Sequence, residues 1–454
     1  MAGALSFEDL KEAVAVGDID TVLVVQVDMQ GRLMGKRFHA NYFVDSAHKE
    51  THGCNYLLAT DLEMSTIDGY KATNWSAGYG DYTMRPDLST LRRIPWLDGT
   101  ALVFCDVLDH HGHDVPHAPR AMLKRQIARL ESMGFRAFTA SELEFFLFQQ
   151  SYEQLQTDGH RSARPIGAYN EDYHIFQTTK EEDVMRALRN GLEGADVPVE
   201  SSKGEADAGQ EEINVRYAEA LTMADRHALV KNAAKEIAWS KGRSLTFMAK
   251  YKTTAIGNSC HIHQSLTDLD GKPVFFDPAA EHGMSATMRH YMAGLLEHAT
   301  EITYFLAPYV NSYKRFAKGT FAPTKAVWSM DNRTAGFRVC GADTRSVRVE
   351  CRIGGADLTP HLAMAALLAA GMDGIERRLA LEPVFVGDAY KAEGIREIPR
   401  TLRAARDALD SSQWLRRAFG DDVVDHYVFA ATWEQSEADR VVTDWDLARG
   451  FERA

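Results

Sequence analysis

Two glutamates at alternate positions of an apolar segment are the first sign of chemistry in this sequence. Residues 139–148 read Thr-Ala-Ser-Glu-Leu-Glu-Phe-Phe-Leu-Phe, and the period of a β-strand places Glu142, Glu144, Phe146 and Phe148 on one face. Two carboxylates about 7 Å apart beside two aromatic rings need cations if they are buried. We therefore expect a divalent metal ion at this strand; a solvated strand edge is the alternative.

Two further segments carry candidate ligands. Residues 200–215 are rich in acids, and Gly204 and Gly209 allow the chain to turn between them, although acidic loops are commonly just solvated. Farther along, His261 and His263 occur at positions i and i+2 of a candidate strand, so both imidazoles share a face and can contact a metal or a phosphate. A histidine pair on its own is as often structural as functional.

A fourth segment alternates strictly between apolar and charged residues. In residues 346–353, the valines, Cys351 and the isoleucine share one face, and Arg348, Glu350 and Arg352 share the other. This pattern also fits a ladder of charges on a surface strand. Three more arginines precede it and add guanidinium groups suited to carboxylates and phosphates: Arg315, Arg333 and Arg338.

Together these residue types indicate phosphoryl chemistry. Many carboxylates with few histidines suit Mg²⁺ or Mn²⁺ better than zinc or copper, and arginines beside such ions point to nucleotide phosphates. The sequence contains neither a G-x-x-x-x-G-K-[ST] loop nor a dinucleotide-binding G-x-G-x-x-G after a strand. We therefore expect another scaffold, on which metal ions bridge the phosphates and arginines neutralise the charge that develops during transfer.

The composition limits what the rest of the chain can be. The 454 residues are 45% hydrophobic and 25% charged, which is typical of a globular protein. A net charge of −13 argues against a nucleic-acid partner or an anionic membrane surface. The five cysteines form no C-x-x-C pair, and the N-terminal residues lack an apolar run long enough for a signal peptide or a membrane span. A cytoplasmic location fits best.

The elements that must position these residues fall into two parts. Residues 1–112 begin with a helix over 6–16 and continue with strands over 21–28, 31–38 and 100–107, with irregular chain over 69–96. Residues 113–454 alternate strands with long helices, which predicts an α+β class. The helices are expected over 119–133, 223–239, 285–300 and 361–380.

The order of the motifs resembles the glutamine synthetase superfamily over nearly the whole chain. The motifs that carry the resemblance are Glu142-Leu-Glu144, Gly209-Gln-Glu-Glu-Ile213, His261-Ile-His263-Gln-Ser265, Asn311-Ser-Tyr-Lys-Arg315, Arg348-Val-Glu350-Cys-Arg352 and the small-residue segment 365–375. The resemblance implies an N-terminal β-grasp-like domain over 1–112 and a catalytic domain over 113–454, in which an antiparallel sheet forms a funnel surrounded by helices. It also implies a homo-oligomeric ring, usually a dodecamer, with active sites between subunits.

The resemblance also implies a reaction. ATP phosphorylates the γ-carboxylate of glutamate, and a nitrogen nucleophile then attacks the γ-glutamyl phosphate to form an amide. Two or three Mg²⁺ or Mn²⁺ ions per site let the anionic carboxylate approach the anionic phosphate.

Individual roles follow by matching positions. The ligands of one metal are Glu144, Glu205 and Glu212, and those of the other are Glu142, His261 and Glu350. The residues that match glutamate-binding positions are Arg315, Arg352 and Gly257. Those that face the phosphates are Arg333 and Arg338, and those on the nucleotide side are Glu200, His263, Ser265 and Arg348.

The chain departs from the family pattern around the nucleophile. Glutamine synthetases carry Gly-Tyr-Glu-Ala-Pro where this sequence has Gly319-Thr-Phe321-Ala-Pro323, and an aromatic ring cannot take a proton from ammonium. The family's His-His-Glu is replaced by Lys203-Gly204-Glu205, and Tyr173 falls where a tyrosine lines the ammonium pocket. The acids that could complete a rebuilt pocket are Asp61, Glu63 and Asp68.

These departures predict a γ-glutamyl-amine ligase, similar to the synthetases that couple glutamate to ethanolamine, polyamines or short alkylamines. An ordinary glutamine synthetase with an altered flap is one alternative. A non-catalytic ring with a structural or regulatory role is the other. The amine and the number of subunits are left open by the sequence.

Overall fold

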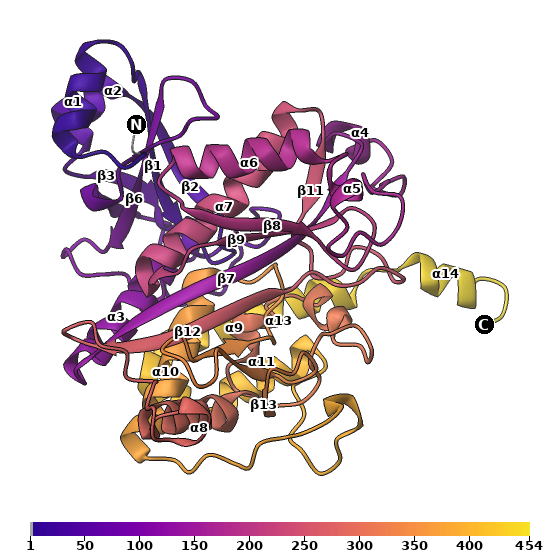
Figure 1. Cartoon of the computed structure of the whole chain (residues 1–454). Coiled ribbons are helices and arrows are strands. Elements are labelled where there is room, and N and C mark those ends of the chain that lie inside the picture. The colour runs from indigo at the N-terminus through magenta and orange to yellow at the C-terminus, as the bar shows by residue number, and fades with distance from the viewer. Residues whose placement is uncertain (1–2) are drawn as a thin grey trace.

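The structure is a computed structural model that describes residues 3–454, and its chain forms two β-sheets with helices packed around them (Figure 1). The first sheet has the strand order β2-β1-β6-β4-β3, with β5 paired to β6. Strand β1 runs antiparallel to β2 and parallel to β6. Its elements are α1 (Phe7–Ala15), β1 (Thr21–Val27), β2 (Leu33–His39), α2 (Ala40–Tyr42), β3 (Thr51–Cys54), β4 (Asp81–Pro86), β5 (Arg92–Arg93) and β6 (Thr100–Leu108).

Alternate residues of the first sheet divide between two cores. Val22 and Val24 belong to a small core that includes Leu10 of α1, whereas Leu23 and Val25 belong to the main core of the molecule. This division follows from the period of two, because successive side chains of a strand point to opposite faces. The first 112 residues therefore share a core with the rest of the chain, and the domain boundary near residue 113 stays a prediction.

The second sheet has nine strands in the order β13-β14-β15-β12-β7-β9-β8, and β10 and β11 also pair with β7. Every pairing is antiparallel except that of β13 with β14. The strands are β7 (Phe135–Phe148), β8 (Val199–Gly204), β9 (Gln210–Val215), β10 (Ala218–Glu219), β11 (Ser244–Thr246), β12 (Cys260–Asp268), β13 (Trp328–Met330), β14 (Phe337–Cys340) and β15 (Arg348–Cys351). The strand expected over 346–353 is thus shorter than its alternating pattern suggests.

The helices pack mainly around the second sheet. They are α3 (Pro119–Ser132), α4 (Tyr152–Gln156), α5 (Ile175–Thr178), α6 (Glu182–Gly194), α7 (Ala220–Ser240), α8 (Ala286–His298), α9 (Thr303–Leu306), α10 (Pro360–Arg377), α11 (Leu402–Ser411), α12 (Gln413–Phe419), α13 (Asp421–Asp439) and α14 (Asp444–Gly450). Helices α3 and α7 contact β7, and α6 contacts β8. Helix α10 is buried at every position from Pro360 to Gly374, as expected for a helix that is apolar all round. The α+β class expected from the sequence is confirmed.

One buried arginine joins the first sheet to the helices of the second. Arg120, near the start of α3, forms ion pairs with Asp87, with Asp106 of β6 and with Asp225 of α7. Removing one member of such a buried network leaves an uncompensated charge, so the junction is held by electrostatics as well as by the shared core. Among the helices of the described chain, none combines the length and apolar character that crossing a lipid bilayer requires.

Candidate active site

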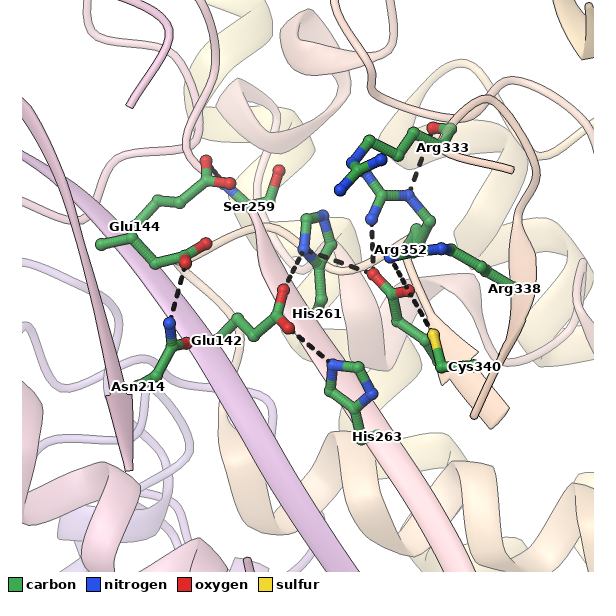
Figure 2. Close-up of polar contacts among 12 residues, drawn as sticks. Glu142, Glu144, Asn214, Ser259, His261, His263, Arg333, Arg338, Cys340 and Arg352 are labelled. Atoms are coloured by element: carbon green, nitrogen blue, oxygen red, sulfur yellow. Dashed lines mark hydrogen bonds and ion pairs between the residues drawn. The ribbon is translucent and has the colours of Figure 1, made fainter. Parts of the chain in front are cut away.

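A stripe of polar side chains crosses one face of the nine-stranded sheet. The register places Glu144 opposite Glu212, and Glu142 opposite His261. It also places Glu350 between His263 on one side and Arg338 on the other. Directly opposite residues of antiparallel strands share a face, so four distant sequence motifs meet on one surface (Figure 2).

The first acid set consists of Glu144, Glu205 and Glu212, whose oxygens lie within 4.8 Å of one another. Burial raises the pKa of Glu144 to about 8, and the neighbouring charges of Glu205 and Glu212 add to the effect. Burial likewise raises the pKa of Glu212 to about 7. Lys203 forms an ion pair with Glu205. The fully ionised set would therefore carry more negative charge than its surroundings neutralise, so the acids retain protons unless a cation is bound.

The second acid set consists of Glu142, His261 and Glu350, and it is already neutralised by its neighbours. The His261 Nδ1 atom lies 3.0 Å from Glu142 and 3.6 Å from Glu350. Burial disfavours the charged form of Glu350, but the adjacent His261 imidazole and Arg352 guanidinium outweigh it and lower its pKa to about 2. Burial of Glu142 is likewise outweighed by hydrogen bonds from two imidazoles, and its pKa is lowered.

Arginines line the side of the stripe next to Glu350. Arg338 donates a hydrogen bond of 2.9 Å to Glu350, and Arg352 forms an ion pair with the same carboxylate (Figure 2). Arg348 Nε lies 3.1 Å from Nδ1 of His263. Since a guanidinium can only donate, Nδ1 accepts, and the other ring nitrogen donates the 2.8 Å bond to Glu142.

Arg315 is fully buried beside the first acid set. It donates to the Ser259 hydroxyl at 3.1 Å and to the carbonyls of Ile353 at 2.9 Å and Arg352 at 3.0 Å. A Cβ atom added at Gly257 would lie 2.6 Å from Cγ of Arg315, so only glycine lets the arginine lie against this backbone. Gly257 and Arg315, two of the residues that the family resemblance assigned to glutamate binding, are therefore in direct contact.

Residues 116–449 match the protein family described as glutamine synthetase, catalytic domain. The chain belongs to the glutamine synthetase family. It is 48% identical over 450 residues to the gamma-glutamylethanolamide synthetase of Streptomyces coelicolor, covering 99% of this chain and 96% of that protein. It is 35% identical over 454 residues to the glutamate–isopropylamine ligase of a Pseudomonas species, covering 98% and 99%.

The chain is also similar to a glutamine synthetase sequence and to a solved structure. The chain is 36% identical over 399 residues to the glutamine synthetase of Thermus thermophilus, covering 85% of this chain and 87% of that protein. The solved structure of GmaS with ADP superimposes with a TM-score of 0.85 at 27% identity, covering 98% of this chain and 99% of that one. The resemblance seen in the sequence motifs is therefore confirmed.

The donor chemistry of the stripe fits the divalent ions expected in this family. Five of the six predicted ligands are carboxylates and one is an imidazole, the set that Mg²⁺ and Mn²⁺ prefer. The structure brings Glu144, Glu205 and Glu212 together as predicted. It divides the second predicted set: Glu142 and Glu350 group with His263, and Glu142 and Glu212 group with His261, although His261 also lies 3.6 Å from Glu350. Their roles as ligands stay a prediction.

Other predicted residues lie apart from the two acid sets. Glu200 is exposed at an irregularity of β8, and Ser265 is half-buried on β12; in the described chain neither makes an ion pair or hydrogen bond with the acids. The exposed Arg333 contacts the site through its backbone carbonyl, which accepts a 3.2 Å hydrogen bond from Arg352. Tyr173 and Phe321 are 68% and 53% exposed.

Three polar residues that sequence reasoning left without a role also contact the stripe. Gln210 and Asn214 donate to Glu144 at 3.3 Å and to Glu212 at 2.9 Å, respectively. Their alternation with Glu212 along β9 is the signal that could have identified them, because all three share a face. Lys203, opposite Glu212 on β8, places its ammonium 4.4 Å from the Tyr173 ring.

A cavity of about 680 Å³ lies elsewhere, between the β1–β2 turn and α7. None of the predicted site residues lines it. Its buried Lys231 donates to the carbonyls of Ala356 at 2.9 Å and Leu358 at 3.2 Å, so this charge already has partners. The residue chemistry of the stripe, rather than the size of this cavity, therefore locates the candidate active site.

Proposed function

We propose that this protein is an ATP-dependent ligase that joins the γ-carboxylate of glutamate to a small primary amine through γ-glutamyl phosphate. The observation that carries the proposal is the convergence of the two acid sets with Arg315, Arg338 and Arg352 on one sheet face. The names of the two amine ligases that match the chain end to end support the choice of reaction.

Each group on the stripe has a role in this reaction. Two or three Mg²⁺ or Mn²⁺ ions held by the two acid sets would supply the positive charge that lets carboxylate and phosphate approach. Arg315 and Arg352, with the Gly257 backbone, orient glutamate. Arg333 and Arg338 would neutralise the negative charge that develops on the transferred phosphoryl group, because a guanidinium carries a permanent positive charge. The nucleotide is held by Glu200, His263, Ser265 and Arg348.

The amine is selected by residues around Tyr173 and Phe321. Both have left-handed backbone conformations, with φ of 56° and 57°, which bulky side chains rarely adopt. Such strain is concentrated at functional sites, where surrounding structure holds it in place. The Phe321 ring packs against the alkyl part of the amine, whereas a glutamate there would bind ammonium.

The acid that completes the amine pocket comes from a neighbouring subunit in this proposal. Within one chain, Asp61 accepts a 3.2 Å hydrogen bond from Trp433 of α13, so it is held against the C-terminal helices. Glu63 and Asp68 follow in the same segment. In the predicted homododecamer, the same segment of the next subunit would face the stripe.

Assembly into a ring is supported by apolar residues at the C-terminus. Helix α14 projects from the body of the molecule (Figure 1), and Trp445 and Phe451 are largely exposed there. Exposed apolar side chains that gather in one place favour contact with another chain. The ring size and the cytoplasmic location stay predictions.

An ordinary glutamine synthetase is the second candidate, favoured by the similarity to the enzyme of Thermus thermophilus. A non-catalytic ring is less well supported, because all six predicted metal ligands retain usable donor atoms.

The test is phosphate release by the pure protein with ATP, Mg²⁺ and glutamate against ammonium, methylamine, isopropylamine, ethanolamine and putrescine. We expect the highest kcat/KM with one of the four organic amines. Phe321→Glu should shift the preference toward ammonium, and Phe321→Leu is its matched control. A wild-type preference for ammonium would favour the glutamine synthetase alternative, and no turnover with any amine would favour the non-catalytic one.

A further inference from the structure

Three glutamates meet on the opposite side of the catalytic strand β9. Glu211 neighbours Glu212 in sequence, so its side chain points to the other face of the sheet. There its carboxylate joins those of Glu171 and Glu181, with one oxygen of each within 4.8 Å of the others. Their exposed fractions are 1%, 0% and 0%. None of the three belongs to the proposed active site.

Most of the oxygens in this buried triad lack a partner. Both oxygens of Glu171, both of Glu181 and one of Glu211 are buried without a hydrogen-bond donor, and in residues 3–454 no lysine, arginine or histidine pairs with them. Burial favours the neutral acids and raises the pKa values of Glu171 and Glu181 to about 9, and the neighbouring carboxyl groups, Glu181 beside Glu171 and Glu211 beside Glu181, add to the effect. An unpaired buried charge is costly, so the triad needs either a cation or shared protons.

Two glycines make room for this arrangement. A Cβ atom added at Gly167 would lie 2.6 Å from the Glu171 carboxylate. One added at Gly204 would lie 2.5 Å from the Glu171 carbonyl oxygen and 3.0 Å from its Cγ atom. Gly204 is one of the positions at which the sequence departs from the family motif. The departure is therefore explained by the close approach of Glu171 to β8.

We propose that Glu171, Glu181 and Glu211 bind one hard divalent cation, Mg²⁺ or Mn²⁺, at a structural site separate from the active site. Three carboxylates supply an all-oxygen donor set and enough negative charge to hold such an ion in a dry environment. An ion that contacts all three side chains would give one oxygen of each carboxylate the partner that it lacks.

The site fastens the segment that carries Tyr173 to the nine-stranded sheet. Glu171 precedes Tyr173 by two residues, and Glu181 stands at the start of α6, whereas Glu211 lies on β9 beside Glu212. One ion thus ties the segment 165–181, which carries Tyr173, to the strand that carries a predicted active-site ligand. Loss of the ion should loosen the amine pocket while the opposite face keeps its own ligands.

Calorimetric titration of the full-length protein with Mn²⁺ tests the proposal. Glu181→Gln should bind one ion fewer per chain than the wild type, and Mn²⁺ should raise its melting temperature less. Asp183→Asn, an exposed acid two residues away, is the matched control and should bind the wild-type number. An unchanged ion count in Glu181→Gln would overturn the proposal and indicate shared protons.

A second measurement avoids the need for a folded variant. Anomalous diffraction from wild-type crystals grown with Mn²⁺ should show a peak among Glu171, Glu181 and Glu211 in addition to those at the active site. Peaks at the active site alone would rule out the structural ion.

Discussion

The two acid sets lie on the same face of one sheet and each contains a buried glutamate, yet the electrostatics of these two glutamates are opposite. The pKa of Glu144 in the first set is raised to about 8, whereas that of Glu350 in the second is lowered to about 2. Both carboxylates are buried, so burial does not distinguish them. The difference comes from the neighbours: two acids surround Glu144, and His261 and Arg352 surround Glu350.

This contrast separates two ways of preparing a metal site. The first set has too few positive charges and should gain an ion while releasing protons. The second set already has guanidinium groups paired with Glu350, so an ion held there would compete with them for this carboxylate. We expect Arg338 and Arg352 to turn toward phosphate and glutamate when this happens, which would couple metal binding to substrate binding.

The largest expected effect is the loss of activity on removing a charge from the first set. Glu144→Gln keeps the shape of the side chain but removes the predicted ligand of one ion. Losing several kcal/mol of transition-state stabilisation corresponds to about a 1,000-fold fall in kcat/KM. Steady-state assays with the preferred amine would measure it, with the exposed Glu219→Gln as control and circular dichroism to verify the fold. Activity within tenfold of wild type would remove Glu144 from the site.

The free energies of unfolding of Glu350→Gln and Glu144→Gln should differ, because the two acid sets differ in their neighbouring charges. Glu350→Gln leaves the buried Arg352 without its counter-ion, although Arg338 keeps its ion pair with Asp331, and this should cost about 3–5 kcal/mol of unfolding free energy. Glu144→Gln instead relieves repulsion among three acids, so its free energy of unfolding in EDTA should equal or exceed that of the wild type. Urea unfolding of both variants in EDTA measures the difference. Equal destabilisation of the two would contradict the contrast.

The stability of the metal-free protein should fall as pH rises, because the first acid set must then lose its protons. Because the pKa of Glu144 is raised above its ordinary value in the folded protein, the stabilisation is complete at low pH and is lost as pH rises toward about 8. The melting temperature in EDTA should therefore fall between pH 6 and 8.5. The melting temperature of Glu144→Gln should fall less steeply, because the variant lacks this carboxyl. Glu171 and Glu181 act in the same direction in both proteins, so the difference between the two curves isolates the contribution of Glu144. Parallel curves for the two proteins would argue against a raised pKa.

Alternation was enough to predict which residues of each strand face the site. Glu142 with Glu144, His261 with His263, and the charged face of residues 346–353 all follow from a period of two. Whether these residues lie together on one surface depends on the order and register of the strands. Local patterns do not predict strand order and register, whereas the resemblance to a known family does. The family membership and the α+β class could thus be predicted before the structure was known.

The buried triad shows what such reasoning misses. Glu171 lies in a loop and Glu181 at a helix start, so neither belongs to a periodic pattern, and only Glu211 sits in a recognised motif. The motif was assigned to metal binding through Glu212, whose side chain lies on the active-site face of β9, so Glu211 on the opposite face received no role. Contacts between a loop, a helix end and a strand depend on how these elements pack. Local sequence does not show whether an acid in a loop or at a helix start is buried or exposed.

The smallest expected effect concerns a residue that orients a ligand rather than binding the ion. Asn214 donates a 2.9 Å hydrogen bond to Glu212, so Asn214→Ala should let that carboxylate rotate. Partners of this kind contribute about 10–100-fold in metal affinity, so the expected loss is smaller than that on removing a ligand itself. Mn²⁺ titration should show weaker binding at the first set with an unchanged number of ions. If Asn214→Ala binds Mn²⁺ as tightly as the wild type, backbone register alone positions Glu212, and the side-chain network around the first set is dispensable.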